Sequence, residues 1–136
     1  MTEIQVKLLF RRFAVINLLM SLLLLFLYEK LELSERISAF MVINIGYFMF
    51  YFFLSRGLTI QFKWIKKNSK SSIFKFQIKM IMLFTVFIKI CAVIFLLALI
   101  LKAIATKEFY SVSAVCVPIS VYLGGTLAGL NIQRIE

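Results

Sequence analysis

Histidine and aspartate are absent from the sequence, which contains only two cysteines, one proline and five glycines. Without histidine, and with Cys91 and Cys116 far apart inside apolar runs, the chain lacks the ligand spacing of a zinc or redox site. We therefore expect both cysteines to be buried packing residues. A single proline, few glycines and no Ser/Gly tract leave no flexible linker, which predicts one domain over residues 1–136.

Acidic groups are also scarce: all six are glutamates, and none lies inside a long apolar run. Proton-coupled carriers, small drug antiporters and acid-lined cation channels usually need a carboxylate within the membrane. No nucleophile stands beside a base, as hydrolysis or phosphoryl transfer would require. The sequence therefore predicts a protein that is not an enzyme, with no catalytic residues, no metal site and no cofactor.

Apolar residues dominate what remains, at 62% of the 136 residues, with a mean hydropathy of +0.99. A soluble domain is about 45–50% apolar, so the polar residues here are too few to cover the outside of a core in water. Lipid accepts the surplus. Four stretches approach the ~20 residues that cross a ~30 Å hydrocarbon core, which predicts an all-α membrane protein with spans at 13–28, 37–54, 80–101 and 109–130.

Short connections would fold these four spans into two antiparallel hairpins. A basic loop over 55–79 is expected to join the hairpins, and within it Ser71 or Ser72 is predicted to cap a helical extension of the third span. The first stretch is short for a bilayer, so we expect that helix to begin before residue 13.

Lysine and arginine are distributed unequally between the two ends of the predicted spans. Eleven lie at the end that carries the termini and the 55–79 loop, and four lie at the other end with Glu29, Glu32, Glu35 and Glu108. Loops rich in Lys and Arg stay cytoplasmic. Both termini and the central loop are therefore predicted to face the cytoplasm.

The basic loop places Lys63, Lys66, Lys67 and Lys70 next to Trp64. Interleaved basic and aromatic residues also line grooves for single-stranded nucleic acid, but beside two membrane spans they are typical of an interfacial anchor. We therefore expect membrane lipid and no nucleic acid as a partner. Topology explains this charge most simply, and the functional alternative is an anionic partner, either lipid headgroups or an acidic protein surface.

Lys89 is the one charged residue within the predicted spans, ten residues into the third. A central lysine costs about 2.5–3.5 kcal/mol to insert, which each apolar neighbour offsets by about 0.3–0.6 kcal/mol, so insertion needs no partner for the ammonium. Two interpretations remain. The charge is tolerated by snorkelling, or it binds an oxygen ligand such as a partner carboxylate or a lipid phosphate.

Uncharged polar residues recur at helical spacing on the first three predicted spans. They are Asn17 and Ser21 on the first, Asn44, Tyr47, Tyr51 and Ser55 on the second, and Thr85 four residues before Lys89 on the third. We expect these stripes to face inward and to hydrogen-bond between helices, at about 0.6–1.7 kcal/mol per contact, with a transport pathway as the alternative. Asn17, Asn44, Tyr47, Thr85 and Lys89 are thus the candidates for partner contacts inside the membrane.

The fourth span contains a GxxxG pair, Gly125 and Gly129, which lets a neighbouring helix approach closely. Pro118 lies near the middle of the same predicted span, where it would kink the helix or free a carbonyl for a partner donor.

Together these features resemble the ATP synthase subunit I family, small bacterial membrane proteins encoded beside the F-type ATP synthase. The resemblance rests on the two-hairpin layout and on the segments Leu8–Phe13, Ser38-Ala39, Arg56 and Phe87–Leu99. The last of these is similar to the family's third span, which also carries a lysine early in an aliphatic run. The chain departs from the family's glycine-rich second span, since it has only Gly46 there.

The resemblance implies an accessory protein of the bacterial inner membrane that assists assembly or stability of the ring of proton-translocating c subunits. A role in magnesium supply is also proposed for the family. Lys89 would then meet a partner carboxylate. Other classes stay open: a four-span transporter or lipid-linked sugar flippase, a structural subunit of another membrane complex, and a homo-oligomer.

Overall fold

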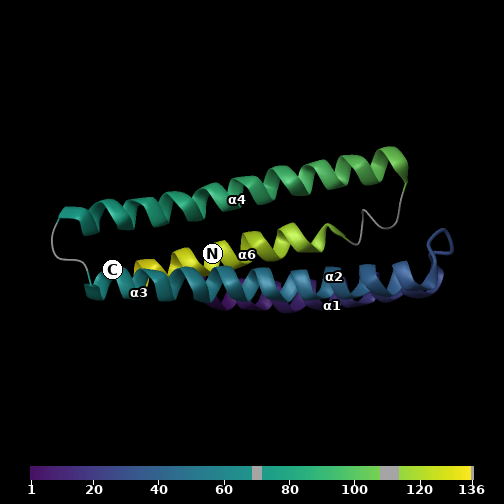
Figure 1. Ribbon diagram of the computed structural model, residues 1–136, viewed down its shortest axis with the longest axis horizontal. Coiled ribbons are helices and arrows are strands. Elements are labelled where there is room, and N and C mark those ends of the chain that lie inside the picture. Colours follow the sequence, from purple (N-terminus) through teal and green to yellow (C-terminus); the bar gives the residue numbers. More distant parts are fainter. Residues whose placement is uncertain (69–71, 108–113, 136) are drawn as a thin grey trace.

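The computed structural model describes residues 1–68, 72–107 and 114–135, and these residues form four helical rods (Figure 1). The rods are α1 (Glu3–Leu27), α2 (Leu33–Phe52) continuing through the π-helical segment η1 (Phe53–Gly57) into α3 (Leu58–Asn68), α4 (Ser72–Thr106), and α6 (Cys116–Ile135). The predicted all-helical fold is confirmed.

Three of the described rods are long and apolar enough to cross a membrane: Glu3–Leu27, Leu33–Asn68 and Lys75–Thr106. They contain the first three predicted spans, except for Tyr28, which directly follows the last residue of α1. Residues 109–113 of the predicted fourth span lie outside the described residues, and α6, which holds the rest, is not among the three. Nine of the 20 residues of α6 are buried, because this helix contacts each of the other described helices.

Helix α6 occupies the middle of the molecule, with α1 and α2 on one side and α4 on the other (Figure 1). Helices α1 and α2 run antiparallel, and so do α4 and α6, as the short connections predicted. A core of seven buried residues joins α1, α2 and α6: Val6, Phe10, Tyr47, Tyr51, Cys116, Leu123 and Leu127. Helix α4 lies outside this core and packs mainly on α6.

The first helix begins at Glu3, earlier than its apolar stretch, as expected. Thr2 explains the start, because its hydroxyl accepts from the Gln5 amide at 3.4 Å while the Gln5 side chain accepts from the Thr2 amide at 2.8 Å. At the other end of α1, the Arg36 guanidinium donates to the Leu25 carbonyl at 3.2 Å. A cation there satisfies a terminal carbonyl and complements the helix dipole.

The prediction of a loop over residues 55–79 is wrong, because the described residues of this segment are helical. Residues 55–68 continue the second rod, and 72–79 are the first turns of α4, so the helical extension of the third span is confirmed. The physical reason is an apolar stripe: Leu58, Phe62 and Ile65 recur at helical spacing and are buried. Phe62 and Ile65 form a cluster with Ile78, Ile81 and Ile132. Ser71 lies outside the described residues.

Two further expectations need correction. Pro118 is the third residue of α6 and does not interrupt its middle. Proline is tolerated in a first turn because the N–H it lacks would have no helical partner there. Of the cysteines, Cys116 is buried as expected, whereas Cys91 is exposed on α4.

Candidate functional site

The polar stripes of α1 and α2 meet each other. Asn17 Nδ2 donates to Asn44 Oδ1 at 3.0 Å, and Asn44 Nδ2 donates to Ser21 Oγ at 3.0 Å and to the Phe40 carbonyl at 2.8 Å. Asn17 and Ser21 are fully buried. These three side chains therefore bind α1 to α2.

Tyr47 makes the second polar link between these helices. Its hydroxyl donates to the Phe10 carbonyl at 2.7 Å, and the Phe10 ring stacks on Tyr47 and Tyr51 with centroid distances of 5.0 and 3.6 Å. Thr85, on α4, returns its hydroxyl to the Met82 carbonyl of its own helix at 2.7 Å. Asn17, Asn44, Tyr47 and Thr85 thus each donate a hydrogen bond within this chain, although the buried Asn17 Oδ1 has no partner among the described residues.

Two adjacent glycines of α6 contact different helices, Gly124 facing α2 and Gly125 facing α4. A β-carbon on Gly124 would lie 3.0 Å from the Tyr51 carbonyl oxygen and 3.1 Å from Tyr51 Cα, so α6 approaches the backbone of α2 there. A β-carbon on Gly125 would lie 3.3 Å from Lys89 Cγ on α4, and one on Gly129 would have nothing within 4 Å. The two glycines of the GxxxG pair therefore do not share one close contact, and the closest approach is at Gly124.

Lys89 is half-buried where α4 crosses α6, with its aliphatic stem against Gly125. Beside it is a shallow hollow of about 350 Å³, lined by Val86, Lys89, Ile90, Val93, Ile94 and Tyr122. Among the described residues, the Lys89 ammonium has no hydrogen-bond or ion-pair partner. Lys89 and Tyr122 are the two residues with polar groups that line this hollow, and the other four lining residues are apolar.

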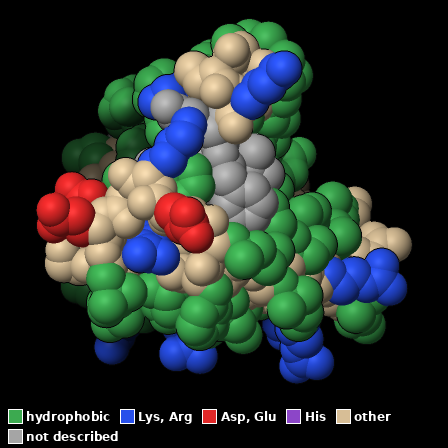
Figure 2. Space-filling model, turned by 90° about the vertical axis from the view of Figure 1, so that its right-hand side faces the viewer, with side chains coloured by type: hydrophobic (Ala, Val, Ile, Leu, Met, Phe, Trp, Pro, Cys, Tyr) green, Lys and Arg blue, Asp and Glu red, His purple; other side chains and the backbone are tan. Residues whose placement is uncertain are grey.

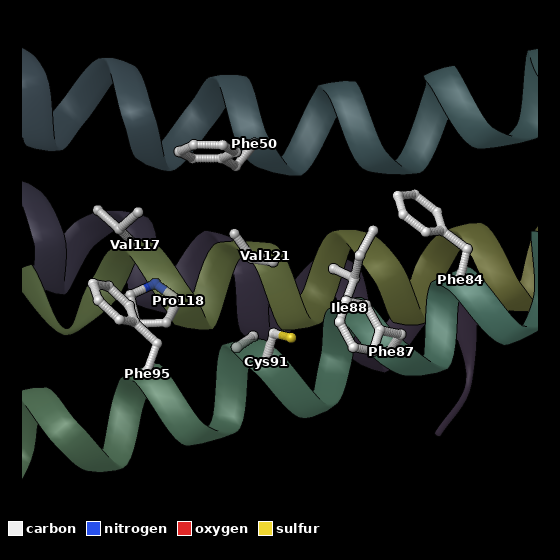
Figure 3. A pocket seen from close by; sticks show the side chains of 10 residues that line it. Phe50, Phe84, Phe87, Ile88, Cys91, Phe95, Val117, Pro118 and Val121 are labelled. Carbon is white, nitrogen blue, oxygen red and sulfur yellow. The ribbon is translucent and has the colours of Figure 1, made fainter.

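An apolar groove follows the opposite flank of α4. Figure 3 shows Phe50 of α2 across from Phe84, Ile88 and Phe95 of α4, with α6 between them. The groove has a volume of about 340 Å³ here, and a neighbouring section of about 560 Å³ continues between α4 and the η1–α3 part of the second rod. Phe50, Phe84, Ile88 and Val121 line both sections.

The two ends of the molecule differ in charge. At the end with the termini, Arg134 pairs with Glu3 at 2.8 Å and the Lys66 ammonium donates to the Ile135 carbonyl. Lys63, Lys66 and Lys67 are exposed on α3, and Lys70 lies outside the described residues. Figure 2 shows the other end, where acidic and basic side chains lie close to one another among hydrophobic ones.

Sequence reasoning did not single out Gly124, Tyr122 or the apolar groove. The groove does have a sequence signal, because Phe84, Phe87, Cys91 and Phe95 recur at helical spacing on α4. Tyr122 gives none, since its place beside Lys89 depends on how α4 and α6 align.

Across the described residues, no group of three His, Cys, Asp or Glu side chains converges to hold a metal ion. Comparison with models of protein families, with curated proteins and with solved structures found no match to this chain. The structure therefore defines an all-helical protein with three helices fit to cross a membrane and a half-buried cation between α4 and α6.

Proposed function

We propose that this chain is a multi-pass membrane protein with a non-catalytic accessory function, binding another membrane protein through α4 and assisting assembly or stability of a complex. The observation that carries the proposal is α4 itself. It is 35 residues long, its span has the highest mean hydropathy of the three, 2.9, and only 11% of that span's most apolar window is buried within the chain.

Lipid alone would cover an apolar helix, so exposure by itself does not require a partner. Helix α4 also carries Lys89, and ionisable residues within membrane segments almost always face protein or a water-filled cavity. A hollow lined by a lysine within the long uncharged stretches of α4 favours a protein surface over lipid tails.

The second candidate, a four-span transporter or lipid-linked sugar flippase, needs polar groups along a pathway. Asn17, Asn44 and Tyr47 are instead used in contacts between α1 and α2. The described groove beside α4 is lined almost wholly by apolar side chains. These contacts favour an accessory role over transport.

The resemblance carried by Phe87–Leu99 suggests the partner. It points to the c subunits of the F-type ATP synthase in a bacterial inner membrane. The eleven-to-four distribution of Lys and Arg favours cytoplasmic termini. The exposed lysines of α3 would then lie among anionic headgroups. A second copy of this chain is the alternative partner.

Photo-crosslinking in native membranes tests the proposal. A crosslinker at Ile94, exposed on α4, should capture another membrane protein, whereas one at Val15, equally exposed on α1, should capture little. Capture of a second copy at Ile94 would favour the homo-oligomer. A monodisperse monomer with no crosslink at Ile94, together with solute flux in liposomes, would favour the transporter.

A further inference from the structure

Lys89 lies at mid-depth on α4. It is 17 residues from Ser72 and 17 from Thr106, which is about 26 Å from either helix end at ~1.5 Å per residue. The nearest charged residues along the helix are Lys79 and Lys102, ten and thirteen positions away. Lys89 is the only charged residue between Lys79 and Lys102. If this part of α4 is buried in a ~30 Å hydrocarbon core, Lys89 lies near the centre of the bilayer.

This chain offers no carboxylate at that depth. Its six acidic residues are all glutamates at positions outside the four apolar stretches: Glu3, Glu29, Glu32, Glu35, Glu108 and Glu136. A second copy has the same distribution whichever way it is oriented. Neither this chain nor a second copy of it therefore has a carboxylate that could pair with Lys89 within the hydrocarbon.

Lipid phosphate is also out of reach. A bilayer of about 40–45 Å including headgroups places phosphates roughly 20 Å from its centre. A lysine side chain with four methylenes extends about 6 Å, even when it snorkels. More than half of the distance from the bilayer centre to the phosphates would therefore still separate the Lys89 ammonium from a lipid phosphate.

The hollow beside Lys89 fits one side chain of a neighbouring helix. Its apolar rim, Val86, Ile90 and Ile94, is exposed and gives a helix a surface to pack on. Tyr122 is 38% exposed, lines the same hollow and carries a second type of donor, a phenol hydroxyl. An ammonium and a phenol hydroxyl are both donors, so the hollow complements a group with two acceptor oxygens.

We propose that Lys89 binds a carboxylate carried at mid-membrane by a transmembrane helix of a different protein, and that this helix packs on the Val86–Ile94 rim. Tyr122 donates to the second carboxylate oxygen. The inference rests on the proposed function, since it names the chemistry of the partner at the same α4 surface.

A designed probe tests the chemistry without knowledge of the natural partner. Two labelled poly-leucine transmembrane peptides, one with a central Glu and one with a central Gln, are mixed with the labelled full chain in phosphatidylcholine vesicles at pH 8. Energy transfer should show at least tenfold tighter association of the Glu peptide. Lys89→Met should abolish this preference, Lys89→Arg should retain most of it, and Lys102→Met, the same change near the end of α4, should leave it unchanged.

Equal association of the two peptides, or an undiminished Glu preference in Lys89→Met, would overturn the inference. Self-association of labelled chains that is lost in Lys89→Met would overturn it too, by assigning the site to a second copy. The Ile94 crosslink separates this failure from that of the proposed function. A crosslink that persists at full yield in Lys89→Met leaves the partner surface standing and removes the ion pair, whereas no crosslink in the unaltered chain removes the partner surface.

Discussion

The stem of Lys89 lies against Gly125 across the contact between α4 and α6, where a β-carbon on the glycine would come within 3.3 Å of Lys89 Cγ. Lys89 of α4 and Gly125 of α6 are therefore parts of a single contact between the two helices. Because Gly125 has no side chain, the lysine stem lies directly on α6, and Lys89 lines the same hollow as Tyr122.

Replacing Gly125 with alanine should retain the fold and weaken partner binding. The atom it meets is the methylene stem of Lys89, which can move by a few tenths of an ångström. We expect a smaller loss of the Ile94 crosslink than in Lys89→Met, at unchanged abundance. Gly129→Ala, on the same helix with open space around it, is the control and should crosslink like the unaltered chain.

Replacing Gly124 with alanine should destabilise the fold itself. Its β-carbon would lie 3.0 and 3.1 Å from backbone atoms of Tyr51, which cannot move without shifting α2. Overpacking of this kind costs about 1–3 kcal/mol. Thermal unfolding in mild detergent should have a lower midpoint temperature for Gly124→Ala than for the unaltered chain. Gly129→Ala should not lower this midpoint. Equal midpoints for the two variants would contradict the close approach of α6 to α2.

Asn44→Ala should loosen the α1–α2 hairpin. The substitution removes hydrogen bonds to Asn17 and Ser21, each an interhelical contact worth about 0.6 kcal/mol and at most ~1.7 kcal/mol. Titration of detergent-solubilised protein with SDS should show a loss of about 1–3 kcal/mol. Ser38→Ala, which removes only a bond to the Ser34 carbonyl on the same helix, should change little. A stable Asn44→Ala chain would mean that the network is dispensable.

Labelling of single cysteines in intact cells tests the orientation that the eleven-to-four bias predicts. In a chain with Cys91 and Cys116 replaced by alanine, Lys30→Cys should react with a membrane-impermeant thiol reagent. Lys67→Cys, exposed at the end of α3, should react only after permeabilisation. The reverse pattern would invert the topology.

Long apolar runs predicted the first three helices well, because a stretch that matches the bilayer needs no tertiary partner to specify it. The 55–79 region was missed for the opposite reason. Its stripe of Leu58, Phe62 and Ile65 is short and lies among lysines. It becomes a buried face only against other helices, with Phe62 and Ile65 in a cluster with Ile78 and Ile132, and Leu58 in a cluster with Ala128. Sequence spacing alone does not show that such a partner exists.

The site was predictable residue by residue but not as an arrangement. Lys89 and Gly125 were both singled out, yet their contact depends on how α4 and α6 align, which no local pattern encodes. The GxxxG spacing identified Gly129, but helix rotation turns Gly124 toward α2 and leaves Gly129 in open space. A motif gives the separation of two residues along a helix and not the neighbour that each one faces.

The second rod has 36 residues, about 54 Å at ~1.5 Å per residue, and even a 40° tilt leaves about 41 Å along the bilayer normal against a core of about 30 Å. In the proposed membrane topology, the end that emerges from the hydrocarbon would be the lysine-bearing one, where Phe62 and Ile65 pack against Ile78 of α4. Water would drive burial at that end, with the heat-capacity signature of the hydrophobic effect, whereas lipid would give no such driving force around Asn17 and Asn44. Cooling should weaken the emergent cluster first, so the two ends of one continuous helix would obey different thermodynamics.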